Sequence, residues 1–350
     1  MARTIISTVG TSLIKNAGRK IGADKALDKV KLVRYLQDEP QNKASAETNA
    51  LSRVARQDDR LVFLHSHTPD GLICAQALCA YYQKASHECE AIEIQDLTYT
   101  ETSFKMRGLR SLVAEMINNI KKEHDRKREV LINATGGFKA EIAYATLVGL
   151  LFDVPVYYIH EAFADIIEMP PTPISWDMNL LADHEDFFVW IDKDIQKTHL
   201  VEERLAGLPE KIRLLLCEED GFCMLSPTGE AIWQAYRKHL AELPEDMVLL
   251  SSHAQKTLSN ATFSQKKDMH NVLHKLASPI LRRGGSCQTS PLDCMIYPRG
   301  NQPIRVFYYE LNDKAYVCEL ASHTDGSYER LRKKGVKRSN YKNFEPYYGA

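Results

Sequence analysis

Two short segments of the chain combine glycines, hydroxyl side chains and a lysine in a pattern suited to binding phosphate. The first, STVGTSL at Ser7–Leu13, and the second, NATGGFK at Asn133–Lys139, each follow a β-branched or apolar run. Glycines let backbone N–H groups approach phosphate oxygens, hydroxyls add donors, and Lys139 adds a positive charge. We expect the two segments to form one phosphate-ester site. Neither has the GxGxxG spacing, so a nicotinamide cofactor is disfavoured.

A second group of residues, in the last hundred positions, has the character of an RNA-binding surface. Residues 251–350 contain 16 Lys and Arg against 8 Asp and Glu, whereas the rest of the chain contains 29 against 38. The densest basic run, Arg330–Arg338, is followed by Tyr341 and Phe344. Cations pair with phosphates and aromatic rings stack on bases, so the mixture suits RNA, with a solvated basic surface as the alternative.

The elements that must position these residues are strands and helices that alternate through the first 170 residues. Strands that are apolar on both faces predict an α/β fold, with a Rossmann-like parallel sheet covered by helices on both sides. Ligands of such sheets bind at the carboxyl ends of the strands, where both glycine segments fall. The expected strands cover residues 3–9, 61–65, 91–94, 129–133 and 154–160. The expected helices include one with Leu27, Val30, Val33 and Leu36 inward, one capped by Ser45, and others at 70–82, 109–120 and 139–151.

Three motifs in this region resemble the CRISPR-associated Rossmann-fold (CARF) sensor domains. They are TIISTVGTSL at 4–13, LHSHTPDG at 64–71 and INATGGFKAEIAYATL at 132–147. The resemblance implies a homodimer that binds cyclic oligoadenylate, commonly cyclic tetra-adenylate, across its twofold axis. It also implies a set of ligand-binding residues, which are Gly10, Thr11, Ser12, Asn16, Asp70, Thr135, Gly136, Gly137, Phe138 and Lys139. Some relatives cleave the ring. In this sequence Ser12 and Lys139 would orient the ribose 2'-OH and stabilise the phosphorane in that reaction.

The middle of the chain, residues 176–248, changes character. LPEKIRLLL at 208–216 and GFCMLSPTGEAIW at 221–233 resemble the winged-helix segment that follows many such sensors, with helices expected at 205–217 and 230–240. Residues 202–250 hold 10 acidic and 5 basic residues, a balance that repels DNA phosphates. We therefore expect a connector and consider DNA an unlikely partner.

The last part, residues 249–350, is expected to hold a helix at 263–281, a turn at Gly284-Gly285, and strands at 294–297, 304–311 and 315–320 with a hairpin turn at Asn312-Asp313. IRVFYYELNDKAYVCELASH at 304–323 resembles the central hairpin of RelE-type mRNA interferases, which form an α+β domain with an antiparallel sheet. The resemblance implies a metal-independent endoribonuclease that works in the ribosomal A site.

Cleavage of RNA without metal requires a base, an acid and positive charge beside the phosphate. By resemblance and position, Arg305 and Arg299 supply charge, His323 acts as acid or base, and Lys333, Lys334 and Tyr341 contact or support the substrate. The pattern departs from the usual family because lysines are missing at Met295 and Tyr297, which leaves the general base unassigned. An alternative for Arg305 is an ion pair with Glu319 across the hairpin.

The sequence thus predicts a type III CRISPR-Cas ancillary effector with a CARF sensor at 1–175, a winged-helix-like connector at 176–248 and a RelE-like mRNA interferase at 249–350. The expected partners are a second copy of the chain, cyclic oligoadenylate, mRNA and the ribosome. No metal or cofactor is expected, and the lack of a signal peptide or long apolar run predicts a cytoplasmic protein without membrane contact. The alternatives are a ligand-responsive transcription regulator and an enzyme that only degrades cyclic oligoadenylate.

Overall fold

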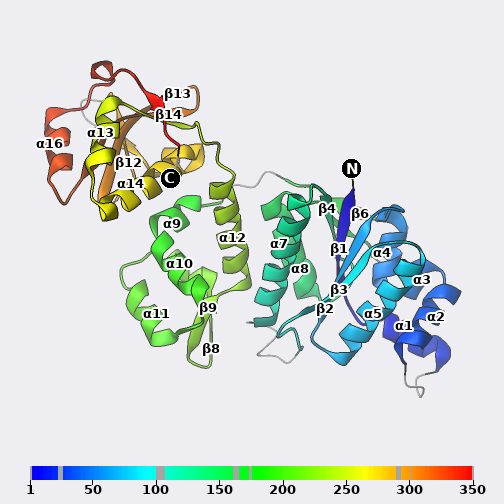
Figure 1. Cartoon of the computed structure of the whole chain (residues 1–350). Helices are drawn as coiled ribbons and strands as arrows, with labels where there is room; N and C mark the ends of the chain where they lie inside the picture. Colours follow the sequence, from blue (N-terminus) through cyan, green and yellow to red (C-terminus); the bar gives the residue numbers. More distant parts are fainter. Residues whose placement is uncertain are drawn as a thin grey trace. The chain divides into compact units, whose positions relative to one another are not determined.

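The chain folds into two compact units, which we describe one at a time (Figure 1). The first unit comprises Met1–Ser175 and Asp186–Ala235, and the second comprises Trp176–Glu185 and Tyr236–Ala350. The computed structural model describes residues 2–22, 27–99, 107–160, 165–172, 176–288, 293–300 and 302–348. The predicted boundary after residue 175 lies outside the described residues, and the division into three domains stays a prediction.

A six-stranded sheet forms the centre of the first unit. Its strands follow the spatial order β3-β2-β1-β4-β5-β6, in which only the last pair, β5 and β6, is antiparallel. The strands are β1 (Arg3–Val9), β2 (Arg60–Ser66), β3 (Cys89–Ile94), β4 (Glu129–Asn133), β5 (Val156–Tyr158) and β6 (Ile167–Met169). β1 and β2 are buried along their whole length, as expected for parallel strands covered on both faces. The predicted parallel α/β sheet is confirmed.

Helices cover both faces of this sheet (Figure 1). On one side lie α1 (Ser12–Ile21), α2 (Lys29–Asp38), α3 (Gln41–Ala44), α4 (Ala46–Val54) and α5 (Pro69–Lys84), and on the other lie α7 (Leu109–Asp125) and α8 (Lys139–Phe152). The predicted cap at Ser45 is confirmed, because its hydroxyl accepts from the backbone N–H of Thr48 at 3.1 Å. The apolar stripe predicted for residues 109–120 is buried as expected.

Two details of the N-terminal helices differ from the prediction. α1 begins directly after the first glycine turn, in a stretch whose polar residues gave no clear helical period. In α2, Val33 and Leu36 are buried, but Val30 is 77% exposed, and Leu32 and Tyr35 take the inward positions instead. The helix packs on the core with the i, i+3, i+4 stripe that begins at Leu32, and Val30 lies on the face exposed to solvent.

The remainder of the first unit is a small helical region with a three-stranded sheet, β7-β9-β8. Its elements are α10 (Glu185–Lys193), β7 (Gln196–Lys197), α11 (Thr198–Leu205), a 3-10 helix at Glu210–Leu215, β8 (Leu216–Glu219), β9 (Phe222–Leu225) and α12 (Pro227–Ala241). The helix predicted at 205–217 is wrong, because Gly207 has a φ of +87° and Pro209 cannot continue a helical ladder. The predicted helix at 230–240 is confirmed within α12.

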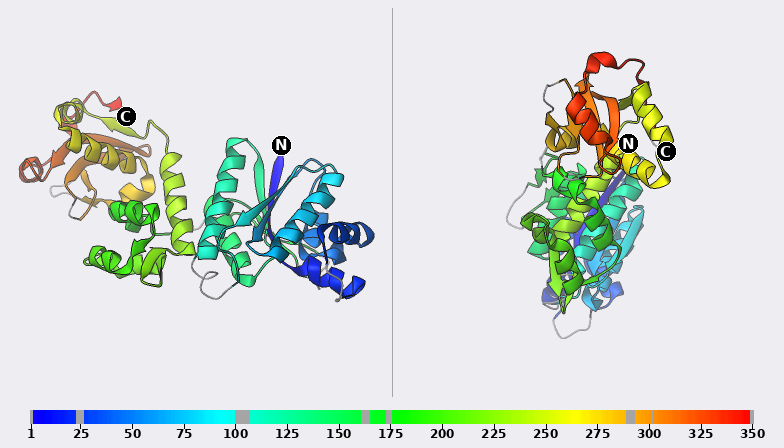
Figure 2. Two further views of the ribbon diagram at one scale, coloured as in Figure 1. Left: turned by 60° about the horizontal axis from the view of Figure 1, so that its bottom comes forward. Right: turned by 90° about the vertical axis from the view of Figure 1, so that its left-hand side faces the viewer.

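The second unit is built on a sheet with the order β11-β12-β13-β14-β10-β15. Its strands are β11 (Cys287–Gln288), β12 (Met295–Tyr297), β13 (Ile304–Leu311), β14 (Lys314–Ser322), β10 (Val248–Leu250) and β15 (Glu345–Pro346), and its helices are α9 (Met178–Asp183), α13 (Ser252–Asn260), α14 (Phe263–Ala277), α15 (Pro279–Gly285) and α16 (Ser327–Lys334). Figure 2 shows the orange strands of this sheet between the yellow helices and the red α16. The predicted turn at Asn312-Asp313 is confirmed, with both residues at positive φ.

The helix predicted at 263–281 is divided in the structure. Ser278 caps a new helix whose first residue is Pro279, because proline lacks the N–H that the preceding helix would need. The predicted turn at Gly284-Gly285 is also wrong, since both glycines belong to the end of α15. No helix in the described residues combines the length and the apolar character that a bilayer crossing requires.

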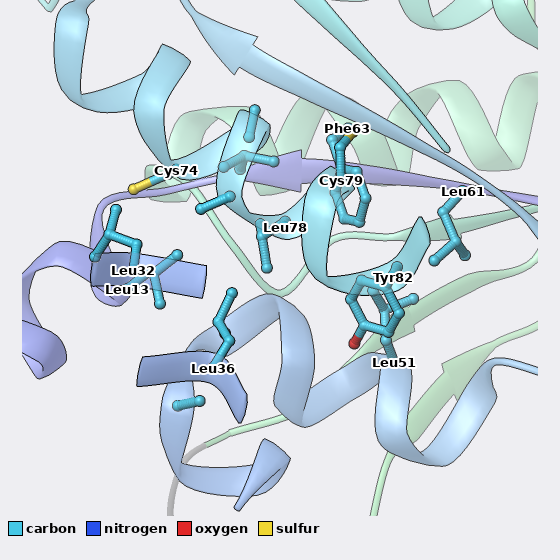
Figure 3. Close-up of a cluster of buried hydrophobic side chains, with 14 of the residues drawn as sticks. Leu13, Leu32, Leu36, Leu51, Leu61, Phe63, Cys74, Leu78, Cys79 and Tyr82 are labelled. Atoms are coloured by element: carbon cyan, nitrogen blue, oxygen red, sulfur yellow. The ribbon is translucent and has the colours of Figure 1, made fainter. Parts of the chain in front are cut away.

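A large apolar cluster of the first unit lies between the sheet and its N-terminal helices (Figure 3). Phe63 of β2 and Tyr82 of α5 stack there at a centroid distance of 6.1 Å. We predict that Phe63→Ala lowers the free energy of unfolding by about 3–5 kcal/mol, because it leaves a cavity in a fully buried site. Urea denaturation followed by circular dichroism measures the change. Val30→Ala, on the exposed face of α2, is the control and should change it by less than about 0.5 kcal/mol.

Candidate functional site

The two glycine segments lie side by side at the carboxyl edge of the first sheet. The register of β1 and β4 pairs Ser7 with Asn133, so the chain leaves both strands at the same level. The hydroxyl of Thr8 then donates to the carbonyl of Gly136 at 2.6 Å, and the side-chain amide of Asn133 donates to Ser7 Oγ at 3.2 Å. These bonds join the two turns into one rigid surface.

That surface forms the floor of a cavity of about 660 Å³. Nine of the ten ligand residues predicted from the sequence line it, and only Asp70, an exposed residue in the first turn of α5, does not. The nine are Gly10, Thr11, Ser12, Asn16, Thr135, Gly136, Gly137, Phe138 and Lys139. The sequence interpretation missed the other lining residues, which are Lys15, Arg19, Asn42, Lys43, Ser45, Ala46, Asn49 and Tyr99.

The cavity is strongly electropositive. Among the residues that the structure describes, its lining carries the cationic side chains of Lys15, Arg19, Lys43 and Lys139 and no acidic side chain. The helices α1, α4 and α8 all begin at its wall, and the N-termini of α1 and α8 have no side-chain cap. Uncapped first-turn N–H groups and the helix dipoles favour an anion at this place. The arrangement can therefore bind a ligand with several phosphates.

Two aromatic rings stand at the cavity wall. Phe138 is 52% exposed, which is unusual for a large apolar side chain, and its ring lies 4.4 Å from the ring of Tyr99. Burial raises the pKa of Tyr99 to about 12, so its hydroxyl stays protonated. An exposed aromatic face beside a cationic pocket is suited to stacking against a nucleobase.

Two buried carboxyl groups, Glu47 and Glu141, lie directly beneath the glycine turns. Glu47 Oε1 accepts from the backbone N–H of Gly10 at 2.8 Å, and Ser12 Oγ lies 3.4 Å from Oε2. Burial raises the pKa of Glu47, while the hydrogen bond from Gly10 opposes that rise. For Glu141, burial and then the charge of Glu47 raise the pKa to about 8. Nothing in the sequence distinguishes these residues from ordinary helical glutamates.

The carboxyl groups also explain why the turns contain glycine. A Cβ at Gly136 would lie 2.1 Å from Glu47 Oε1 and 2.6 Å from the carbonyl oxygen of Thr8. A Cβ at Gly137 would lie 2.1 Å from Glu141 Oε2, and the φ of this residue is +96°. Neither position accepts a side chain without displacing the cavity floor.

In the second unit, the candidate residues form a smaller cluster around Arg305. Arg305 is 4% exposed. Its guanidinium donates to the carbonyl of Gly300, while Nη1 is buried without a hydrogen-bond partner among the described residues. The ring of Tyr328, from α16, lies 5.6 Å from Arg305 Cζ and 4.4 Å from the ring of His323. Arg305 and His323 are therefore brought together through Tyr328, which the sequence interpretation did not single out.

The other residues predicted for this unit have other contacts or are exposed. Tyr341 donates to Glu319 Oε1 at 2.8 Å, so the carboxylate expected as the alternative partner of Arg305 is occupied by a tyrosine. Arg299 is exposed, and its charge acts on Asp183 of α9. Lys333 and Lys334 are exposed on α16. These three cations remain candidates for contacts with a polyanion.

Two histidines, His65 and His270, have hydrogen-bond partners within the fold. His65 Nδ1 lies 2.9 Å from the carbonyl oxygen of Ser66, and His270 Nδ1 contacts the hydroxyl of Tyr347. Across the part of the chain that the structure describes, no cluster of three or more His, Cys, Asp or Glu side chains is arranged to hold a metal ion.

The comparison with protein families assigns a class to part of the first unit. Residues 42–172 match the family described as CRISPR-associated protein (Cas_APE2256). This segment, which includes the second glycine turn and both buried glutamates, is thus similar to a CRISPR-associated family.

Three solved structures are similar to the chain. Can2 from Sulfobacillus thermosulfidooxidans in complex with cyclic tetra-adenylate has 11% sequence identity and a TM-score of 0.26, and the match covers 69% of this chain and 66% of Can2. Protein VC1899 from Vibrio cholerae has 9% identity and a TM-score of 0.28, with 90% of this chain and 79% of VC1899 covered. Csm6 from Enterococcus italicus bound to cyclic hexa-2'-fluoro-hexa-dAMP has 9% identity and a TM-score of 0.31, with 79% of this chain and 61% of Csm6 covered. The chain spans less than two thirds of the length of Can2 and of Csm6.

Glu141 makes the first unit sensitive to pH. Its folded-state pKa of about 8 exceeds the ordinary value of 4.5, so the folded protein holds a proton that the unfolded chain releases. We predict that the free energy of unfolding falls between these two pH values, by up to about 1.4 kcal/mol per pH unit from this residue. Urea denaturation at a series of pH values should show a shallower decline for Glu141→Gln. Glu203→Gln, at an exposed carboxyl on α11, serves as the control and should keep the wild-type slope.

Proposed function

We propose that the chain is a type III CRISPR-Cas ancillary effector whose first unit senses cyclic oligoadenylate, with cyclic tetra-adenylate as the favoured ring. The observation that carries this proposal is the cavity over the two glycine turns, with four cations and two uncapped helix N-termini in its wall. Such a wall suits a ligand with several phosphates. The match of residues 42–172 to a CRISPR-associated family supports the same conclusion.

The adenine and ribose parts of the ligand have candidate partners in the same cavity. Phe138, exposed beside Tyr99, offers a face on which an adenine stacks. Asn16 and Asn49 can hydrogen-bond to base or sugar edges. A symmetric ring presents the same groups twice, so two copies of the chain bind it across a twofold axis, each with one set of turns.

The second unit is proposed to be a RelE-like, metal-independent endoribonuclease that cuts mRNA, with the ribosomal A site as its place of work. Arg305 supports this role, because a buried guanidinium whose Nη1 has no hydrogen-bond partner among the described residues gains a strong partner when a phosphate arrives. The helix α16 adds Arg330, Arg332, Lys333 and Lys334 beside it. A ribosome that bends the mRNA would supply the orientation that a small toxin lacks.

Communication between sensing and cleavage is proposed to pass through the winged-helix-like connector. Arg110 of α7 donates to Glu230 of α12 at 3.0 Å, and Lys121 donates to Gln234 at the same distance. α12 extends beyond residue 235, where the second unit of the chain resumes. A ligand that binds one conformation of the sensor dimer more tightly shifts the population toward it, and α12 is the element in position to report the change.

Two variants test whether the first unit binds the ligand and the second unit cleaves the RNA. Lys139→Ala removes a charge from the cavity wall, so it should weaken binding of cyclic tetra-adenylate about tenfold or more, which isothermal titration measures. It should leave cleavage by ligand-saturated protein intact. Arg305→Ala should keep the affinity and lower mRNA cleavage on translating ribosomes by about 10²-fold or more. Lys29→Ala, an exposed cation on α2 away from the cavity, is the matched control.

The same assay separates the alternative functions. A ligand-responsive transcription regulator would leave the mRNA intact with or without the ring. An enzyme that only degrades the messenger would open the ring and spare the mRNA. Full cleavage by Arg305→Ala would refute the proposed active site.

A further inference from the structure

The second unit contains an acid-base group that the sequence did not reveal. We propose that His253 of α13 is the general base of the ribonuclease, and that Glu319 and Tyr341 are the positioning residues that hold it. This inference rests on the ribonuclease function proposed above.

The three side chains meet at one carboxylate oxygen. Oε1 of Glu319 lies 3.2 Å from His253 Nδ1 and accepts from Tyr341 Oη at 2.8 Å. The rings of His253 and Tyr341 stand edge to face with centroids 5.4 Å apart, so the imidazole is held on two sides. The residues come from α13, from β14 and from the segment after α16, which are far apart in the sequence.

The carboxylate determines which imidazole nitrogen can accept a proton. An ionised Glu319 only accepts hydrogen bonds, so the neutral His253 ring must carry its proton on Nδ1. The lone pair is then on Nε2, the nitrogen that does not face Glu319. Glu319 is 13% exposed, whereas His253 is 66% exposed, so the group that takes the proton is open to a substrate. A buried carboxylate that holds Nδ1–H, with Nε2 free to accept a proton, is the arrangement by which a carboxylate orients a histidine base.

The sheet register places Glu319 two residues from the position opposite Arg305. Arg305 pairs with Ala321, and Phe307, two residues further along β13, pairs with Glu319. Glu319 therefore stands about 7 Å along β14 from the position opposite Arg305. Phe307, Ala321, Tyr328 and Tyr341 pack in one cluster, which shows that these residues share a face of the sheet.

His323 stands on the other side of Ala321, again two residues away. Its ring contacts Tyr328, which lies over Arg305. Glu319, which holds the imidazole of His253, and His323 thus lie two residues away on opposite sides of Ala321, the residue paired with Arg305. An in-line displacement at phosphorus needs a base and an acid on opposite sides of the phosphate, which is the arrangement these residues offer.

The proposed reaction balances without a metal or a co-reactant. Nε2 of His253 takes the proton of the ribose 2'-OH, and the 2'-oxygen forms a bond to the adjacent phosphorus. The bond from phosphorus to the 5'-oxygen breaks, and that oxygen receives a proton from His323. Arg305 stabilises the negative charge on the phosphorane. The products are a 2',3'-cyclic phosphate and a 5'-hydroxyl.

The same unit contains a matched pair without the carboxylate. His270 contacts the hydroxyl of Tyr347, and their rings stack with centroids 5.8 Å apart. Tyr347 packs against the other apolar cluster of this unit, around Leu273 and Tyr308. His270→Ala therefore removes a histidine with a tyrosine partner from the same fold, and it is the control for His253→Ala.

The experiment uses the full chain, saturated with cyclic tetra-adenylate, on translating ribosomes. His253→Ala should lower the rate of mRNA cleavage by about 10²–10⁴-fold and should change the pH profile of the rate. Added imidazole should restore part of the rate to this variant and none to Arg305→Ala. His270→Ala should cut at the wild-type rate.

The positioning residues require a separate readout. Glu319→Gln keeps the size of the side chain but allows an amide to donate to Nδ1, which moves the ring proton to Nε2 and disables the base. It should lower the maximal rate with little change in KM, and free imidazole should rescue it as well. Tyr341→Phe should cause a smaller loss of the same kind.

The outcomes separate this inference from the function on which it rests. If the wild-type chain cuts no mRNA in the presence of the ring, the ribonuclease proposal fails and His253 has no reaction to serve. If the wild type cuts and His253→Ala keeps both the rate and the pH profile, only the assignment of the base is wrong. A rate loss that imidazole does not repair would identify His253 as structural and also overturn the assignment.

Discussion

Contact between two glycine turns, without intervening side chains, is the constraint on which the first unit depends. A Cβ at Gly10 would lie 2.7 Å from the backbone nitrogen of Gly137, so the turns can touch only as glycines. The pairing of β1 with β4 sets this approach, and the bond from Thr8 to Gly136 holds it. The N-termini of α1 and α8 then lie at one place because β1 and β4, the strands that precede them, end there, and α4, which follows α3, begins at the same cavity wall. Charge, hydrogen-bond donors and shape at the cavity all follow from this arrangement of the backbone.

Two buried carboxyl groups, those of Glu47 and Glu141, lie beneath this surface. A buried carboxyl group beneath an anion site would repel the anion if it were ionised, and burial raises the pKa of both groups. The backbone N–H of Gly10 donates to Glu47, and this hydrogen bond restrains the peptide unit of the first turn from beneath. The floor is thus rigid before a ligand arrives, which reduces the entropy that binding must overcome.

Much of the first unit could be predicted because its signals are local. Apolar runs marked the strands, and glycine with hydroxyl residues marked the turns that line the cavity. The lining residues that were missed, such as Lys15 and Asn49, come from helices whose packing brings them to the turns, which no local pattern encodes. The same is true of the second unit. Arg305 stands in a recognisable hairpin, whereas the partnership of His253 with Glu319 spans 66 residues and depends on how α13 meets the sheet. Pro279 by itself indicates a helix break, but the helical spacing of apolar residues continues past it and favours one long helix.

The attachment of α16 has a consequence for access to Arg305. This helix contains no buried residue and contributes only the partly buried rings and chains of Tyr328 and Leu331 to the sheet face. Its detachment therefore exposes little apolar surface, and local opening of this kind needs far less free energy than global unfolding. Amide protons of α16 should exchange with solvent well before those of β13 and β14. The guanidinium of Arg305 can thus become accessible through a fluctuation of one helix, while the sheet that holds the arginine stays folded.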